Sequence, residues 1–189
     1  MYNHDDFKTA LQTLKDGGVI LYPTDTIWGL GCDARNEQAV KKIYEIKKRS
    51  NKKSMLVLLN NPGAIQKYVS NMPDIAWDLI DLSEKPLTII FSNASNLAPN
   101  LINEDKTIGI RITKEKFSNK LIESLRKPIV STSANISNSP SPQNYSEISK
   151  DIINAVDYVV KYRQEENIKA MPSSIIKLNQ NSEVIIIRE

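Results

Sequence analysis

Hydrophobic and polar positions recur along the chain with two different periods, and these periods predict helices and strands in turn. Residues 5–15 carry their apolar side chains on one helical stripe, and a glycine pair follows as a stop signal. The same reasoning predicts further helices at residues 36–48, 62–69, 73–82, 114–125 and 147–153. Short apolar runs typical of buried strands cover residues 19–21, 55–59, 87–91, 107–112, 128–130, 156–160, 173–178 and 184–188.

The order of these elements predicts the fold class. Helices and strands alternate early in the chain, whereas strands crowd towards its end. This order favours one α/β domain over residues 1–189, with a twisted mixed sheet and flanking helices. No apolar run approaches the roughly 20 residues of a membrane helix, and the first residues lack a signal-peptide pattern. We therefore expect a cytoplasmic protein that does not associate with membranes.

The composition limits the chemistry that an active site could use. The 189 residues include one cysteine, Cys32, and one histidine, His4. These counts exclude an internal disulfide and a zinc site made of several cysteines and histidines. They also argue against a Ser-His-Asp or Cys-His mechanism, because His4 lies in the N-terminal tail. An enzyme of this composition would work with Lys, Arg, Ser, Thr, Asn and carboxylate side chains.

Positive charge is concentrated in one segment. The net charge is only +3, but residues 41–53, KKIYEIKKRSNKK, contain seven cations among thirteen residues. On a helix, Lys47 falls between Val40 and Ile43 on the buried side. It is either a long side chain that reaches solvent at the helix end or a cation directed into a cleft. Together with Arg49 it could hold a polyphosphate, although such a run is more often a solvated basic face.

Polar residues also gather where predicted strands end. YPTDTIWGLG at residues 22–31 places two threonines and an aspartate after a buried strand. Residues 131–146, STSANISNSPSPQNYS, are interpreted as a loop at the carboxyl edge of the sheet, where open α/β sheets bind ligands. The alternative is a polar surface loop of turn residues. Arg111 and Arg188 each come at the end of an apolar strand. Each is either an exposed edge residue or an anchor for a carboxylate. The sequence contains neither the P-loop motif G-x-x-x-x-G-K-[ST] nor the motif G-x-G-x-x-G. Side chains would therefore have to hold the phosphates of any nucleotide.

Several separated blocks resemble one family. YPTDTIWGLGCDA, KKRSNKK, KPLTII, TIGIRI, STSANIS, PSSII and IIIR occur in the order and spacing of the YrdC family, over nearly the whole chain. The resemblance implies a YrdC-like fold with a deep basic cavity. It also implies synthesis of L-threonylcarbamoyl adenylate from L-threonine, bicarbonate and ATP, with release of pyrophosphate. A downstream threonylcarbamoyl-transferase complex would then modify the adenosine next to the anticodon in tRNA.

The resemblance implies roles for individual residues. The catalytic set falls on Lys47, Arg49, Ser133 and Asn135. The ATP-binding set falls on Arg49, Lys53, Thr107, Ser133, Ser141 and Arg188. The threonine-binding set falls on Thr26, Arg111, Ser131 and Ser174. Mg²⁺ is expected to come with the ATP phosphates and not on protein ligands. Gly29 and Gly31 would let the backbone pass close to the substrate.

Some positions depart from the family pattern. The usual Trp-Pro-Gly-Pro before Leu-Thr is Ser83-Glu84-Lys85-Pro86, Leu58 stands where some relatives have a histidine, and residues 163–171 replace a glycine-rich stretch. The cationic set is unchanged.

Two other functions compete with the synthase. A non-catalytic module that binds tRNA or double-stranded RNA would also use a basic groove. Aromatic residues make up only 6% of the chain, and no basic-aromatic platform for bases is present. A carbamoyl-transfer module like that of hydrogenase maturation is the third hypothesis. It ranks lower because the domains that usually accompany it are not present in these residues.

Overall fold

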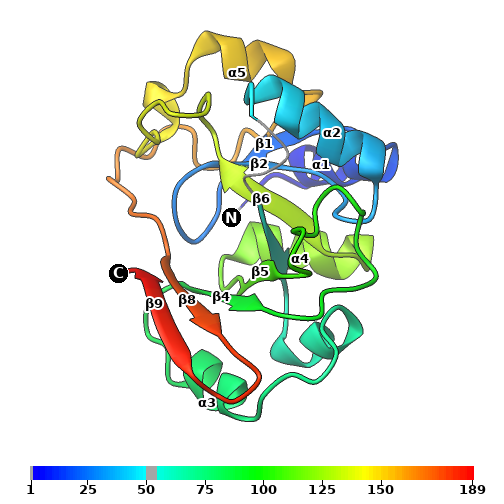
Figure 1. Ribbon diagram of the computed structural model, residues 1–189. Coiled ribbons are helices and arrows are strands. Elements are labelled where there is room, and N and C mark those ends of the chain that lie inside the picture. Colours follow the sequence, from blue (N-terminus) through cyan, green and yellow to red (C-terminus); the bar gives the residue numbers. More distant parts are fainter. Residues whose placement is uncertain (1, 50–54) are drawn as a thin grey trace.

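Nine strands form one sheet in the computed structural model, which describes residues 2–49 and 55–189. The strands are β1 (Ile20–Tyr22), β2 (Gly29–Gly31), β3 (Leu56–Leu59), β4 (Leu87–Phe91), β5 (Ile108–Ile112), β6 (Ile129–Ser133), β7 (Tyr158–Val159), β8 (Ser174–Leu178) and β9 (Val184–Arg188). Their order in the sheet is β7-β1-β2-β6-β3-β5-β4-β8-β9. In Figure 1, β8 and β9, coloured orange and red, form the edge at the lower left.

The sheet is mixed. β1 and β7, β3 and β5, and β4 and β8 run parallel, whereas the remaining neighbours are antiparallel. The helices are α1 (His4–Lys15), α2 (Glu37–Ile46), α3 (Ile75–Asp81), α4 (Lys116–Leu125) and α5 (Lys150–Ala155), with 3₁₀ turns η1 (Pro62–Lys67) and η2 (Tyr145–Glu147). The predicted α/β class, with a mixed sheet and flanking helices, is confirmed. Within the described residues, no helix is long and apolar enough to cross a membrane.

The strands bury side chains on both faces, as the predicted apolar runs require. Successive side chains of a strand point to opposite faces. Leu58 therefore packs with α1 and α4, whereas Val57 and Leu59 pack in the cluster that contains α2 and α3. Leu58, at the position where some relatives have a histidine, is fully buried in this core. Each such leucine contributes about 1.5–3 kcal/mol through burial.

The end of α2 determines the positions of Lys47 and Arg49. The Asn36 side chain caps the helix by accepting from the backbone N–H groups of Gln38 and Ala39, so the helix starts after Asn36. It ends at Ile46, and Lys47 is its C-cap. Lys48 then adopts a left-handed conformation with φ of 49°. The chain turns sharply there, which brings Arg49 back towards the sheet.

The strands β2 and β6 and the turn η1 differ from the sequence-based predictions. The strand β2 was not predicted, because three residues between polar turns carry too little periodicity. β6 extends through Ser133, although residues 131–133 were assigned to the loop. These polar residues continue the strand because β6 lies between β2 and β3 and pairs with both of them. Residues 62–67 form a 3₁₀ turn in place of the predicted α-helix.

The edge strand β9 carries an unusual aliphatic surface. Val184, Ile185, Ile186 and Ile187 are 40%, 40%, 63% and 55% exposed. β9 pairs only with β8 among the described strands, so its outer edge is open, and these exposed side chains alternate between its two faces. An edge of this kind is prone to pair with other strands.

We expect Gly31→Ala to destabilise the protein by about 1–3 kcal/mol, the usual cost of an overpacked core. A Cβ at Gly31 would lie 2.5 Å from Tyr22 Cε1 and 3.0 Å from both Ile129 Cγ2 and the Val130 carbonyl oxygen. Urea unfolding measures the change. Gly63→Ala is the matched control, because a Cβ there meets only Asn61 Oδ1, at 3.4 Å. Equal stability of the two variants would contradict the packing argument.

Candidate functional site

The loop between β1 and β2 is a tightly bonded turn. Thr24 Oγ1 donates to the Ile27 carbonyl oxygen at 2.8 Å and accepts from the Thr26 N–H at 3.0 Å. The Arg163 guanidinium donates to the Thr24 carbonyl oxygen at 3.0 Å and holds the loop from outside. These bonds explain the first polar motif: Thr24 shapes the turn, while Thr26 faces the cavity described next.

A cavity of about 270 Å³ lies against this loop and the strands β2, β3, β5 and β6. Its lining includes the guanidinium groups of Arg49, Arg111 and Arg188, and no carboxylate among the described lining residues. Hydroxyl groups complete the polar part of its wall, from Thr26, Ser131, Thr132, Ser133, Ser141 and Ser173. Three cations with neutral donors and acceptors around them form a wall suited to a polyanion.

Arg111 is the most deeply buried of the three arginines. It projects from β5, is 3% exposed, and its Nη2 lies 3.1 Å from Asp25 Oδ1. The contact is an ion pair without ideal hydrogen-bond alignment, since Asp25 Oδ1 and Arg111 Nε lack a hydrogen-bond partner within the described residues. A buried guanidinium N–H without an acceptor is costly. It offers a donor that an anionic ligand in the cavity could satisfy.

Lys47 lies beneath the turn that follows β6. It is 1% exposed, and its ammonium group donates to the Ser133 carbonyl oxygen, to the Asn135 carbonyl oxygen at 2.7 Å and to Asn135 Oδ1 at 3.4 Å. The Ser137 N–H in turn donates to the Lys47 carbonyl oxygen at 2.9 Å. The oxygens around Nζ suit an ammonium group. Burial, and then the Arg49 guanidinium, lower the pKa of Lys47 to about 7.

Arg49 approaches the same strand from the side. Its Nη1 lies 3.3 Å from Thr132 Oγ1 and donates to it. Burial lowers the pKa of Arg49 from its ordinary value, and Tyr44 partly opposes this effect. Lys47 and Arg49 therefore contact consecutive residues of β6 and the turn after it.

Arg188 brings the far edge of the sheet to the cavity. It is the last residue of β9, and its Nε and Nη2 donate to the Ser173 carbonyl oxygen at 3.0 and 2.6 Å. The Ser173 hydroxyl is 2.8 Å from Thr88 Oγ1. Burial, and then the charge of Arg111, lower the pKa of the Arg188 guanidinium. The two arginines are thus close enough to repel each other, which a bound anion would relieve.

Comparison with known proteins identifies the family. A family model for Sua5, YciO and YrdC proteins, described as "Telomere recombination", matches residues 12–189. The chain belongs to this family. A Methanocaldococcus jannaschii relative, to which threonylcarbamoyl-AMP synthase activity is provisionally assigned, is 35% identical over 99% of this chain and 88% of its own length. The threonylcarbamoyl-AMP synthase of Pseudoalteromonas translucida is 31% identical over 85% of this chain and 87% of its own.

Solved Sua5/YciO/YrdC structures share the fold. P. abyssi Sua5 superimposes with a TM-score of 0.86 at 24% identity, over 96% of this chain. The chain spans about half of that protein, 55% of its length. E. coli YciO superimposes with a TM-score of 0.85 at 22% identity, over 99% of this chain and 90% of its own. The predicted YrdC-like fold is therefore confirmed.

Most of the residues that the family resemblance implicates come together. Seven of them line the cavity: Thr26, Arg49, Arg111, Ser131, Ser133, Ser141 and Arg188. Lys47 and Asn135 lie behind its wall, bonded to each other. Ser174 is adjacent to the cavity, but Ser173 is the serine that lines it. Lys53 lies outside the described residues.

Thr107 and Gly31 are placed apart from this wall. The Thr107 hydroxyl donates to Asp105 Oδ1 at 2.6 Å and accepts from Asn103 Nδ2 at 2.8 Å, just before β5. Gly29 lines the cavity, and its role in letting the backbone pass close to a substrate stays a prediction. Gly31 instead packs beneath Tyr22, so its missing side chain makes room for the core and not for a substrate.

Sequence reasoning missed Asp25 and Thr132. Asp25 is the counter-charge of Arg111, and Thr132 accepts a hydrogen bond from Arg49. A signal for Asp25 existed, because an arginine on a central strand needs a buried carboxylate to pair with. Thr132 gave no such signal, because its residue type in a polar run is equally suited to a turn.

Proposed function

We propose that this protein synthesises L-threonylcarbamoyl adenylate from L-threonine, bicarbonate and ATP, releasing pyrophosphate. The observation that carries the proposal is the cavity with three arginines, six residues with hydroxyl groups and no carboxylate in its described lining. The names of the M. jannaschii and P. translucida relatives support the same activity. The proposed enzyme is a nucleotidyltransferase that acts in the cytoplasm.

The triphosphate of ATP would lie along the wall formed by β6 and Arg188. Arg49 and Arg188 can each offer paired N–H donors to phosphate oxygens. The hydroxyls of Ser133 and Ser141 supply neutral hydrogen bonds on the same wall. Lys47 sets the position of this wall by binding the carbonyl oxygens of Ser133 and Asn135. Lys53 and Thr107 remain predicted ATP-binding residues on the resemblance alone.

L-Threonine would occupy the inner part of the cavity, with its carboxylate on Arg111. The Arg111 Nε has no acceptor within the described residues, so a carboxylate there would satisfy a buried donor. Thr26 and Ser131, which also line the cavity, can bond the hydroxyl and amine of the substrate. Ser173 or Ser174 would complete this set. P. abyssi Sua5, which shares the fold, has been solved in complex with L-threonine.

The chemistry needs positioning and charge neutralisation more than a general base from histidine. The threonine amine attacks the bicarbonate carbon, water leaves, and a carbamate forms. A carbamate oxygen then attacks the α-phosphorus, the bond to the β-phosphate oxygen breaks, and pyrophosphate leaves with the electron pair. Guanidinium groups along the phosphates stabilise the charge that shifts onto pyrophosphate.

Mg²⁺ is proposed to enter with ATP. The cavity wall presents cations and hydroxyls, a donor set that fits phosphate oxygens and lets phosphates carry the metal. When bound, Mg²⁺ would neutralise charge on the β- and γ-phosphates. The product would pass to a threonylcarbamoyl-transferase complex that modifies tRNA.

The deciding experiment is pyrophosphate release by the purified protein with ATP, Mg²⁺ and bicarbonate. Addition of L-threonine is expected to raise the rate, because the amine must form the carbamate before the α-phosphorus is attacked. L-Serine and L-valine are the controls for side-chain specificity. Tight binding of tRNA or double-stranded RNA without threonine-dependent release would favour the non-catalytic RNA-binding alternative.

A further inference from the structure

A second cavity lies on the opposite face of the sheet from the arginine-lined cavity. On β5, Arg111 points to one face while Ile110 and Ile112 point to the other. Ile110 and Ile112 line this second cavity, whose volume is about 370 Å³. Leu87 and Ile89 extend it along β4. The space is within the usual size range for a small-molecule site.

The floor of the second cavity is made of branched aliphatic side chains. They come from η1, α3, β4 and β5, and are Ile65, Ile80, Leu87, Ile89, Ile110 and Ile112. Ile65, Ile89 and Ile110 are buried, so the floor belongs to the folded core and is preformed. Burial of an aliphatic group of matching size against this floor would be favourable, because apolar surface on both sides would be removed from water.

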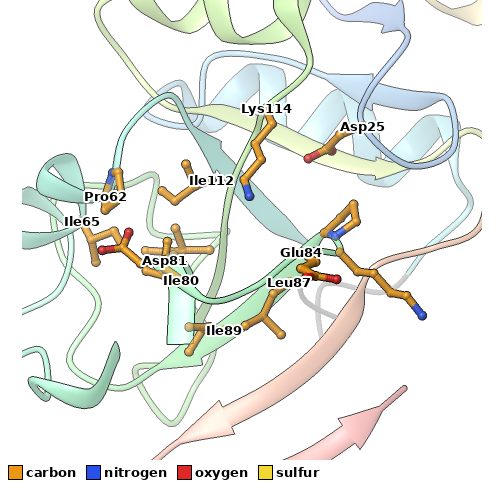
Figure 2. Close-up of a pocket in the computed structure, with 13 residues that line it drawn as sticks. Asp25, Pro62, Ile65, Ile80, Asp81, Glu84, Leu87, Ile89, Ile112 and Lys114 are labelled. Atoms are coloured by element: carbon orange, nitrogen blue, oxygen red, sulfur yellow. The ribbon is translucent and has the colours of Figure 1, made fainter. Parts of the chain in front are cut away.

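The rim of the second cavity carries charges of both signs. Three carboxylates, Asp25, Asp81 and Glu84, stand with two ammonium groups, Lys85 and Lys114. Figure 2 shows Lys114 pointing into the cavity, with Asp25 and Glu84 to one side and Asp81 to the other. Lys114 Nζ donates to the Ser83 carbonyl oxygen at 3.0 Å, which leaves two of its three N–H donors.

These rim charges are not neutralised by each other. Within the described residues, no ion pair joins Asp81, Glu84, Lys85 or Lys114 to any other side chain. A simple carboxylic acid would meet three carboxylates, and a simple amine would meet Lys114. A zwitterion matches both signs, with its carboxylate on Lys114 and its ammonium group between Glu84 and Asp25.

We propose that this cavity is a binding site for a free aliphatic α-amino acid with a branched side chain, such as L-isoleucine. The side chain covers the isoleucine floor, and the two charged ends meet the rim. The site is distinct from the arginine-lined cavity, whose three cations and lack of carboxylates suit a polyanion. L-Threonine is a poorer fit here, because its hydroxyl would lie against aliphatic carbon.

Asp25 connects the two cavities. It lines the second cavity, and it is also the ion-pair partner of Arg111 in the first. An ammonium group bound to Asp25 competes with Arg111 for the same carboxylate. Occupancy is therefore expected to raise the KM for L-threonine severalfold, a coupling that rests on the proposed function.

Titration calorimetry with L-isoleucine tests the site without relying on any enzymatic activity. Saturable binding of one molecule per chain is expected. Two analogues test the two charged ends: 3-methyl-2-oxopentanoate lacks the amine, and 2-methylbutylamine lacks the carboxylate. Each should bind about tenfold or more weakly, the usual loss for a hydrogen bond to a charged group. No binding of L-isoleucine, or equal binding of either analogue, would overturn the proposal.

Variants locate the binding to this cavity. Lys114→Met and Glu84→Gln should each weaken L-isoleucine binding about tenfold, and Ile80→Phe should block it by filling the floor. Lys116→Met and Glu104→Gln are matched exposed controls that do not line the cavity, and should bind normally. Glu84 is exposed, so its variant is expected to fold even if Ile80→Phe does not. Full affinity in both charge variants would place the binding elsewhere. An unchanged threonine KM at saturating L-isoleucine would overturn the coupling alone.

Discussion

Replacing Lys47 by alanine is expected to lower threonine-dependent pyrophosphate release by about two to three orders of magnitude, and so is replacing Arg49. Lys47→Ala removes the charge that holds the turn after β6 and leaves the carbonyl oxygens of Ser133 and Asn135 without their buried donor. Arg49→Ala removes a cation from the cavity wall. Steady-state kinetics with varied ATP measure both losses.

The controls are the neighbouring cations. Lys48→Ala removes an exposed lysine adjacent to Lys47, and Arg35→Ala removes an exposed arginine from outside the cavity. Both should keep nearly normal turnover. If Lys47→Ala and Arg49→Ala also turned over normally, the basic segment would be a solvated face and the proposed function would lose its main support.

The pH profile separates a charge effect from a purely structural role of Lys47. Its pKa of about 7 means that the free protein loses this charge as the pH rises through 7. kcat/KM for ATP, which reports the free enzyme, should therefore decline above pH 7, and Lys47→Ala should lack this decline.

The pKa of Lys47 in the folded protein lies below its ordinary value of 10.5, so unfolded chains bind more protons between pH 7 and 10.5. The contribution of Lys47 to the free energy of unfolding should accordingly rise with pH across that window.

The sequence predicted the regular part of the fold because apolar periodicity determines burial. Residues 87–91 and 184–188 were predicted as strands at the bounds that the structure has. β2 and the end of β6 were missed because their glycine, serine and threonine residues are stabilised by neighbouring strands. No local pattern encodes that pairing. The open faces of β9 were not predictable either, since an apolar run indicates a buried strand.

In the candidate site too, the sequence predicted which side chains are buried better than it predicted their contacts. Lys47 was placed correctly on the buried side of its helix, but the sequence could not say what its ammonium group would contact. The contact is a turn 86 to 88 residues away, and it depends on how α2 ends at Lys48. Asp25 was present in the first polar motif without an assigned role. Two strands, β6 and β3, separate β2 from β5 in the sheet, so only the tertiary contact between the β1–β2 loop and Arg111 reveals its partner.

Replacing Asp25 by alanine is expected to reduce the free energy of unfolding by about 3 kcal/mol or more, because Arg111 would remain as a buried charge without its partner. The KM for L-threonine should rise about tenfold to a hundredfold, since the guanidinium would lose the contact that positions it. Asp25 is a positioning residue in this account. Urea unfolding measures the first effect, and kinetics with varied threonine measure the second.

The double variant Asp25→Ala/Arg111→Met distinguishes pairing from packing. Removing both charges should restore much of the stability lost in Asp25→Ala, because no uncompensated buried charge remains. The KM for L-threonine should not return to normal, because Arg111, the proposed anchor for the threonine carboxylate, is gone. Asp78→Ala, on α3 and outside both cavities, is a control for loss of a carboxylate alone. If Asp25→Ala kept normal stability and a normal threonine KM, the ion pair would have no part in the site. If the double variant had a normal KM for L-threonine, Arg111 would not be the anchor for the threonine carboxylate.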